Sequence, residues 1–170
     1  IDEFMTIFKY LDSKDLFENF YVKKLAFRLL YGLTNSKKGE KYLIERLKGE
    51  CGNAYVTKAE DMFNDIDTSY ELTLNYEKEA YNLNNNINKN NNNFYILSSN
   101  AWPVSKIITG FVNKEITNIN DSFTKFYISK NAGKALSWHL SFCSAELKYH
   151  VAGKDLILEV NGVQAAILAN

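Results

Sequence analysis

The stretch KDLFENFYVKKLAFRLL, Lys14–Leu30, indicates how the first half of the chain folds. Four large apolar side chains recur in it at the spacing i, i+3, i+4 and i+8: Phe17, Phe20, Tyr21 and Leu25. That spacing places them on one face of an α-helix. The stretch therefore predicts an amphipathic helix whose apolar face packs into a core.

Further helices are predicted on the C-terminal side of this stretch. Apolar residues at helical spacing indicate one helix that ends at Gly52 and a second one that follows it: Leu43, Ile44, Leu47 and Cys51, then Ala59, Met62, Phe63 and Ile66. Thr57 and Glu60 have the spacing of a capping box, which predicts that the second helix begins there. A weaker helical pattern runs over 70–83. The first half is thus expected to be a helical bundle segment, 1–83.

Residues 84–93 are almost all asparagine. Asparagine is a poor helix and strand former, because its amide competes for nearby backbone groups. We expect a disordered loop here, which separates the helical segment from a second domain over 94–170.

The second domain changes the hydrophobic period from helical to alternating. Residues 94–97 predict a short strand, and residues 104–115 fit no clear pattern. A helix is indicated by Ile119, Phe123, Phe126 and Tyr127, with Asn118 as its cap and Gly133 after its end. Strict alternation over 136–142, 145–151 and 156–160 then predicts three strands that form an antiparallel meander with one buried face. A last helix begins at Val163, capped by Asn161. The predicted fold class is α+β: the end of a helical bundle, then a small antiparallel sheet with packed helices.

Composition excludes several classes of protein. Twenty basic and twenty acidic side chains cancel, which argues against generic binding to nucleic acid or to an anionic membrane surface. No apolar run reaches about 18 residues, so no membrane span is expected. Cys51 and Cys143 form no C-x-x-C pair, which is typical of a reducing compartment, so we expect a cytoplasmic or nuclear protein. The chain starts with Ile1 and stops in apolar sequence, so we expect a piece of a longer protein.

Catalytic motifs of the common phosphate-binding, dinucleotide-binding, metalloprotease and hydrolase types are absent from the sequence. His139 and His150 both fall on the polar faces of predicted strands, where exposed structural roles are expected rather than metal binding. Glu60, Asp61 and Asp65 lie close together on a predicted helix, and a solvated face is the expected role. We therefore predict no catalytic residue, no metal site and no cofactor.

Several quoted stretches, taken together, resemble the cullin family. FKYLDSKDLFENFYVKKLAFRLL (Phe8–Leu30) is similar to the cullin pattern F-x-x-[LI]-x-x-K-D-x-F-x-x-[FY]-Y-x-x-x-L-A-x-R-L-L. EKYLIERLKGECGNAYVTKAEDMFNDI (Glu40–Ile66) resembles E-K-x-x-I-x-x-L-K-x-E-C-G followed by K-x-E-x-M-F-x-D-I. ILSSNAWP and FTKFYISKNAGKALSW match later cullin pieces in order. Departures include Cys143 in place of a glycine, and Pro103 as the only proline.

The resemblance implies a part of the cullin C-terminal homology region, without the N-terminal repeats and the C-terminal winged-helix domain. It implies a non-catalytic scaffold of a ubiquitin ligase in the pathway to proteasomal degradation. A RING-box protein is the implied partner, and its N-terminal segment adds as a strand to the cullin sheet. The full-length protein is expected to bind substrate adaptors as well and to receive a ubiquitin-like modifier.

The partner-binding residues are chosen from predicted strand positions and from the Trp-Pro stretch that follows the first strand. They are Phe94, Ile96, Leu97, Trp102, Leu136, Trp138, Leu140, Leu147 and Tyr149. Because an unpaired sheet edge promotes association, the isolated chain is expected to self-associate without its partner.

Two other functions are kept as alternatives. One is the cullin-like subunit of the anaphase-promoting complex, which fits the K-D-x-F and E-C-G stretches less well. The remote one is a hydrolase or transferase that uses His139 and His150 with the Glu60 and Asp61 carboxylates.

Overall fold

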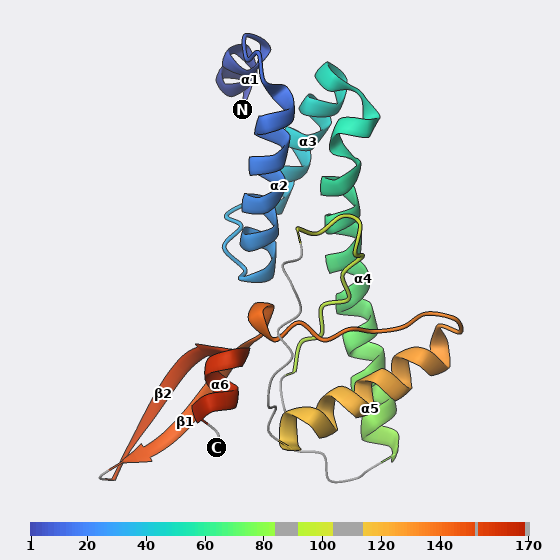
Figure 1. Ribbon diagram of the computed structural model, residues 1–170, viewed down its shortest axis with the longest axis vertical. Coiled ribbons are helices and arrows are strands. Elements are labelled where there is room, and N and C mark those ends of the chain that lie inside the picture. Colours follow the sequence, from blue (N-terminus) through green and yellow to red (C-terminus); the bar gives the residue numbers. More distant parts are fainter. Residues whose placement is uncertain (84–91, 104–113, 152, 169–170) are drawn as a thin grey trace. The chain divides into compact units, whose positions relative to one another are not determined.

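A helical first half and a C-terminal β-hairpin make up the computed structural model, which describes residues 1–83, 92–103, 114–151 and 153–168 (Figure 1). The elements in chain order are α1 (Asp2–Lys9), α2 (Lys14–Leu30), α3 (Lys37–Cys51), α4 (Asn53–Leu83), α5 (Lys114–Lys130), the 3-10 turn η1 (Leu140–Phe142), β1 (Ser144–Val151), β2 (Lys154–Asn161) and α6 (Gly162–Leu168). These elements confirm the α+β fold class. Most of the predicted Asn-rich loop (84–91) and most of the unassigned stretch 104–115 (104–113) lie outside the described residues.

Two compact units share the chain, Ile1–Val104 and Ser105–Asn170. Residues 92–103 therefore group with the helices of the first unit. The division into domains with limits at 83 and 94 stays a prediction.

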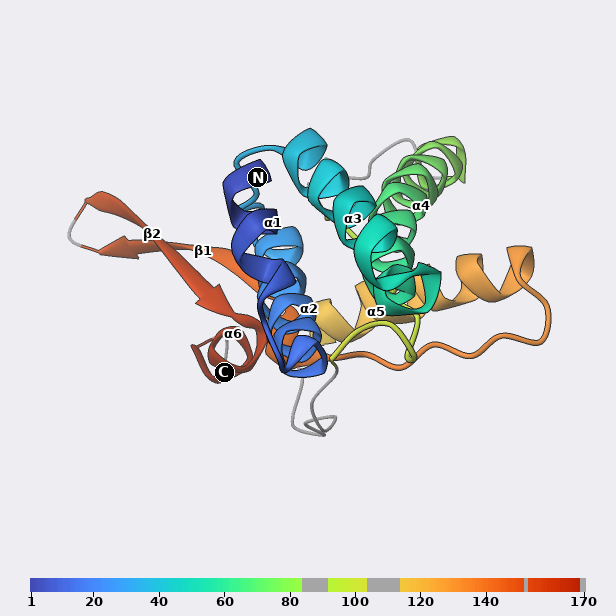
Figure 2. The same cartoon turned by 90° about the horizontal axis from the view of Figure 1, so that it is seen from above.

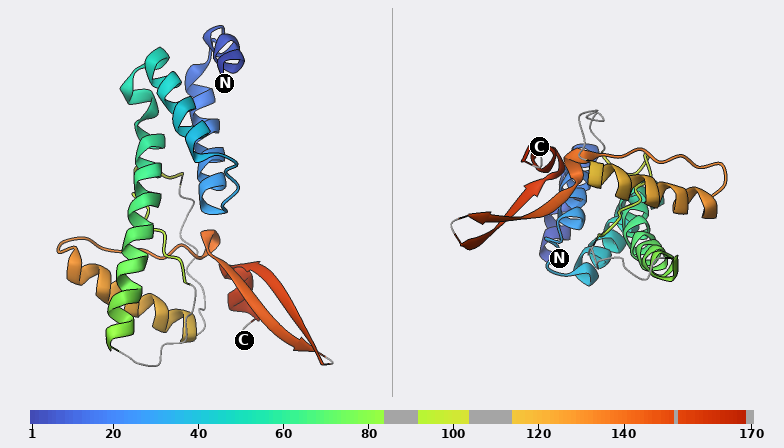
Figure 3. Two further views of the ribbon diagram at one scale, coloured as in Figure 1. Left: turned by 180° about the vertical axis from the view of Figure 1, so that it is seen from behind. Right: turned by 90° about the horizontal axis from the view of Figure 1, so that it is seen from below.

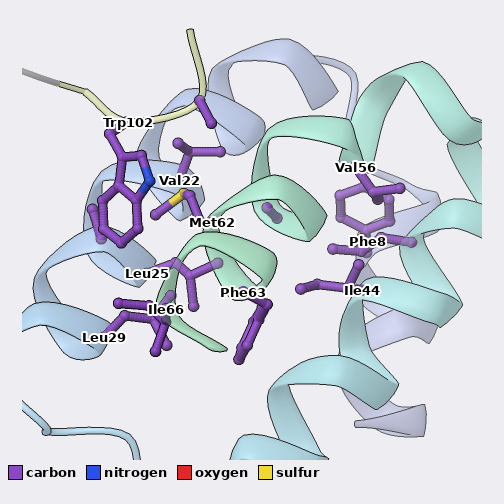
Figure 4. Close-up of a cluster of buried hydrophobic side chains, with 14 of the residues drawn as sticks. Phe8, Val22, Leu25, Leu29, Ile44, Val56, Met62, Phe63, Ile66 and Trp102 are labelled. Atoms are coloured by element: carbon purple, nitrogen blue, oxygen red, sulfur yellow. The ribbon is translucent and has the colours of Figure 1, made fainter. Parts of the chain in front are cut away.

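Helices α2, α3 and α4 lie side by side in the first unit and enclose its core (Figure 2). Leu25 and Met62 are completely buried there, and Leu47 and Phe8 are nearly so. Figure 4 shows Leu25, Met62 and Trp102 within the same cluster of apolar side chains. The predicted core residues Ala59, Met62, Phe63 and Ile66 are all buried, which confirms that part of the pattern.

The buried face of α2 differs from the predicted one. Leu25 is buried as expected, but Phe20 is 58% exposed, and the other buried positions are Val22, Ala26 and Leu29. Apolar side chains occur all around this helix, so the spacing alone does not identify a single face. Phe17 and Tyr21 pack at the margin of the core, with stacked rings 5.8 Å apart.

Helix α4 begins four residues before the predicted capping box. Gly52 ends α3 as predicted, with φ of 88°, and α4 starts directly after it at Asn53. The Thr57 hydroxyl donates to the carbonyl of Asn53 inside the helix, and Glu60 pairs with Lys48 of α3 at 3.0 Å. The capping prediction is wrong, because Thr57 lies inside a helix that begins at Asn53 and in which the preceding residue, Val56, is buried. The weaker pattern over 70–83 belongs to the same helix.

Three polar side chains of α4 hold the segment 94–98 against the helix. The Thr73 hydroxyl accepts from the N–H of Phe94 and donates to its carbonyl. The Ser69 hydroxyl bonds the N–H and the carbonyl of Ile96 in the same way. Asp65 Oδ2 accepts from the Ser98 N–H. The helix residues are four apart, about 6 Å, and the bonded residues of the extended segment are two apart, about 6.6 Å. This match of spacings lets a helix bond an extended chain that runs in the opposite direction.

The predicted strand over 94–97 is therefore extended but pairs with no other strand among the described residues. Its backbone groups bond to α4, and Phe94 packs edge-on against Tyr76 at 5.4 Å. Asp65 also accepts from the Ser98 hydroxyl and from the indole N–H of Trp102, both at 2.8 Å. It thus anchors this segment, and the expectation that it lies on a solvated face is wrong.

In the second unit, the meander is reduced to a two-stranded hairpin. β1 and β2 pair antiparallel, whereas residues 136–139 form no ladder and 140–142 form η1. The Trp138 indole N–H donates to Thr124 of α5 at 3.2 Å, and its ring packs edge-on against Phe123. The alternation over 136–142 thus covers an irregular segment, in which Trp138 packs against α5, and the turn η1. The predicted third strand is wrong.

Helix α5 begins at Lys114, so the predicted cap Asn118 lies inside it, while Gly133 follows its end with φ of 81° as expected. Among the described helices, none combines the length and the apolar composition that crossing a bilayer requires.

Candidate partner-binding site

The hairpin is the candidate site, because it is the only sheet that the described residues form. Its register pairs Ser144 with Asn161 at the base and Val151 with Lys154 at the tip. One step beyond the base, the Gly162 N–H donates to the Cys143 carbonyl at 2.8 Å. Since bonded and non-bonded pairs alternate in an antiparallel ladder, the odd-numbered residues of β1 and the even-numbered residues of β2 bond each other.

Both outer edges of the hairpin present backbone groups that no other described strand pairs with. On β1, the alternation points the N–H and C=O groups of Ser144, Glu146, Lys148 and His150 outward. On β2, it points those of Asp155, Ile157 and Glu159 outward. The Asn161 N–H also points outward, but it donates to Gln164 Oε1 at 3.0 Å, which closes that end of the β2 edge.

The two faces of the hairpin differ in polarity, because directly opposed residues share a face. The apolar face carries Ala145, Leu147, Tyr149 and Val151 of β1 with Leu156, Leu158 and Val160 of β2. Toward the tip this face is open: Tyr149 is 59% and Leu156 52% exposed. The predicted single buried face is thus only partly buried within this chain.

Three charged or titratable side chains meet on the polar face near the tip. Asp155 accepts from Lys148 at 2.6 Å and lies 2.7 Å from Nδ1 of His150. The hydrogen bonds to His150 and then Lys148 hold the pKa of the Asp155 carboxyl below its ordinary value. All three groups are exposed, as predicted for His150.

Helix α6 is joined tightly to the base of the hairpin (Figure 3). Asn161 caps the helix as predicted: its Oδ1 accepts from the Gln164 N–H at 2.8 Å, while Gln164 bonds back. A Cβ atom on Gly162 would lie 2.5 Å from the Leu140 carbonyl oxygen and 2.9 Å from the Cys143 Cβ. The base of the hairpin therefore requires glycine at this position.

We expect Gly162→Ala to destabilise the hairpin–α6 junction by about 1–3 kcal/mol, because the methyl group must push η1 away. Gly49→Ala in α3 is the matched control, since nothing lies within 4 Å of its Cβ position. There the change is expected to stabilise the helix by about 0.5–1 kcal/mol. Hydrogen exchange of the β1 and β2 amides measures the first effect, and thermal unfolding the second. Unchanged exchange in Gly162→Ala contradicts the prediction.

Four of the predicted partner-binding residues lie in the first unit. Phe94 and Trp102 are buried in this chain, and Ile96 and Leu97 are partly buried. Ile96 is held to Ser69 through its backbone, and Leu97 and Trp102 pack in or against the main core. Their prediction as partner contacts stays a prediction.

The other five lie in the second unit, and only two of them are on the hairpin. Leu136 and Trp138 are partly buried in the segment before η1, and Leu140 is buried in η1. Leu147 and Tyr149 both lie on the apolar face of β1. The hairpin thus brings together Leu147 and Tyr149 with Leu156 and Leu158, which the prediction of the site left out although the same alternation contains them.

Two of the four residues proposed for the remote catalytic alternative make other contacts. Glu60 pairs with Lys48, and His150 with Asp155. His139 lies outside the strands, contrary to expectation, and its Nδ1 is buried with no partner among the described atoms. Burial raises the pKa of the Cys143 thiol, which opposes a nucleophilic role. The described residues contain no group of three or more His, Cys, Asp or Glu side chains placed to hold a metal ion.

Comparison with known proteins identifies the class to which this fold belongs. The family model described as the cullin alpha solenoid domain matches residues 1–73, and the one described as the cullin alpha+beta domain matches residues 96–170. The chain belongs to the cullin family, as the resemblance indicated.

Individual cullins are similar over nearly the whole chain. Cullin-4 of Dictyostelium discoideum is 34% identical over 92% of this chain, and Cullin-3 of Schizosaccharomyces pombe is 35% identical over 96%. Cullin-4A of Homo sapiens is 33% identical over 87%. These matches cover 20%, 21% and 19% of the three relatives, so the chain spans about a fifth of their length.

Proposed function

We propose that this chain is part of the non-catalytic scaffold of a cullin–RING ubiquitin ligase, and that its hairpin binds a RING-box protein by strand addition. The observation that carries the proposal is the hairpin, whose two outer edges are unpaired among the described residues and whose apolar face is open near the tip. Membership of the cullin family supports the scaffold role.

Strand addition uses the groups that the hairpin offers. Main-chain hydrogen bonds along an edge supply affinity, and the alternating side chains of the guest meet one polar and one apolar face. An eight-residue strand such as β1 is about 26 Å long at about 3.3 Å per residue. The exposed side chains of Tyr149 and Leu156 lie where a guest strand can cover them with apolar residues of its own.

A scaffold acts by holding its partners at fixed positions, which raises their effective concentration for one another. The helices of the first unit suit such a rigid support. The Glu40 carboxylate joins α3 to α2, since it accepts from Arg28 at 2.7 Å and from the Tyr21 hydroxyl at 3.0 Å. Burial and this carboxylate raise the pKa of Tyr21, so the phenol stays a donor. Adaptor binding and attachment of a ubiquitin-like modifier are proposals for the whole protein.

Proline substitution at outward-pointing positions tests the proposal, because it removes an edge donor and leaves the β1–β2 bonds in place. Lys148→Pro probes the β1 edge, and Ile157→Pro probes the β2 edge. We expect one of the two to reduce copurification with a coexpressed RING-box protein by more than tenfold.

Lys148→Ala and Ile157→Ala are the matched controls, since alanine keeps the backbone N–H, and both are expected to retain the partner. Hydrogen exchange at Leu147 and Leu158 checks that each variant keeps its hairpin. The proposal is wrong if both proline variants keep their hairpins and bind the RING-box protein as the unaltered chain does.

A further inference from the structure

Two neighbouring residues of β1 whose backbone groups point outward carry opposite charges, Glu146 and Lys148. We propose that two copies of this chain pair through their β1 edges, antiparallel, with Glu146 of each copy opposite Lys148 of the other. The result is a four-stranded sheet in the order β2-β1-β1-β2. This inference does not rest on the binding of a RING-box protein.

The register of this pairing follows from the ladder within the hairpin. A two-fold axis at Leu147 places residue 146 opposite residue 148 of the second copy and residue 144 opposite residue 150. All four of these residues point their N–H and C=O groups outward, so both opposed pairs can exchange two backbone hydrogen bonds. A shift of the register by one residue would place residues whose backbone groups point outward opposite residues whose groups bond within the hairpin, and these hydrogen bonds would be lost.

Side chains on both faces agree with the same register. On the polar face, two Glu–Lys pairs form across the axis, which is the favourable cross-strand combination. On the apolar face, Leu147 lies beside Leu147 of the second copy, and Tyr149 beside Ala145. Tyr149 is 59% exposed in the single chain, so this contact covers a large apolar surface.

The β2 edge does not offer a second copy the same match. The residues of β2 whose backbone groups point outward are Asp155, Ile157 and Glu159, and both charged side chains among them are acidic. Self-pairing through β2 would bring acidic groups together or oppose them to Ile157, and the Asn161 N–H is already bonded to Gln164. Charge complementarity therefore selects β1 for the contact between copies.

The Lys148 ammonium already pairs with Asp155 in the single chain. Its side chain is 69% exposed, and an ammonium has three donors, so it can bond Glu146 of a second copy and keep Asp155. Since β1 cannot hold a second copy and a guest strand at once, the dimer competes with any partner strand that uses β1.

Charge reversal tests the pairing. We expect the chain to show a concentration-dependent monomer–dimer equilibrium in sedimentation at low salt. Glu146→Lys places two lysines opposite each other twice per dimer, and Lys148→Glu does the same with two glutamates. Each single variant is expected to weaken the dimer by at least about tenfold, since like charges directly opposed are destabilising.

Restoration by a second change separates charge from misfolding. The double variant Glu146→Lys with Lys148→Glu regains complementarity and is expected to dimerise like the unaltered chain. A mixture of the two single variants is expected to form a mixed dimer, in which both opposed pairs have opposite charges. Asp121→Lys, at an exposed position of α5 outside the hairpin, makes the same change of an acidic side chain to lysine. It is the control and is expected to leave the dimer constant within about twofold.

A chain that stays monomeric up to millimolar concentration overturns the inference. So does a dimer that the two single variants leave unweakened, or one that Asp121→Lys weakens as much as they do. None of these outcomes bears on strand addition by a RING-box protein, which the proline variants test separately.

Discussion

Asp65→Ala is expected to lower the free energy of unfolding of the first unit by roughly 3–5 kcal/mol. One carboxylate oxygen, Oδ2, accepts three hydrogen bonds at 2.7–2.8 Å, from the Ser98 N–H, the Ser98 hydroxyl and the Trp102 indole. Trp102 is only 5% exposed, so its N–H loses its partner inside the core. Hydrogen bonds to a charged group contribute about 1.5–3 kcal/mol each, and they are not additive. Chemical denaturation of the full chain measures the change.

Two further variants show whether the anchor acts through these bonds. Asp67→Ala, two positions along α4, removes a pair with Lys41 in which both side chains are more than half exposed, so a loss of at most about 1 kcal/mol is expected. Asp65→Asn keeps one acceptor oxygen but removes the charge, and we expect an intermediate loss. Equal losses for Asp65→Ala and Asp67→Ala would show that the segment 94–102 is held by its apolar contacts alone.

The sequence predicts most of the helices because their signals are local. Gly52 ends α3, and Asn161 caps α6, since each acts on backbone groups within a few residues. The start of α4 is predicted wrongly because Thr57 and Glu60 have the spacing of a capping box although both lie inside the helix. The first turn of the observed helix makes tertiary contacts that the local pattern does not contain: Val56 is buried, and the Tyr55 hydroxyl donates to the Lys14 carbonyl.

Long-range pairing is what the sequence does not predict. Alternation is the same in β1, which has a partner strand, and in the segment around Trp138, which packs against α5 instead. In the same way, Asp65, Ser69 and Thr73 look like ordinary polar positions of a helix until the segment 94–98 is seen beside them.

The candidate site was predicted from the apolar half of the alternation, which includes Leu147 and Tyr149 of β1. The polar half was overlooked, although Glu146, Lys148 and Ile157 are the residues whose backbone groups point outward. The direction of these backbone groups depends on which opposed residues hydrogen-bond across the hairpin. The hydrogen bond from the Gly162 N–H to the Cys143 carbonyl identifies the bonded pairs.

Leu25→Ala is expected to destabilise the first unit by about 2–5 kcal/mol. The side chain is completely buried where α2 contributes to the main core, as Figure 4 shows beside Met62. Truncation removes buried apolar surface and leaves a cavity among close-packed neighbours, and the two effects add. The midpoint of denaturation by urea measures the loss.

Leu16→Ala is the matched control, because it makes the same chemical change on the same helix at a side chain that is 58% exposed. We expect it to cost less than about 1 kcal/mol, since little surface leaves the core and alanine is the better helix former. The comparison measures which face of α2 the core uses, which the sequence of this helix leaves open. If both leucines cost the same, then α2 is stabilised by its apolar content as a whole, and the buried face formed by Val22, Leu25, Ala26 and Leu29 is not what holds it.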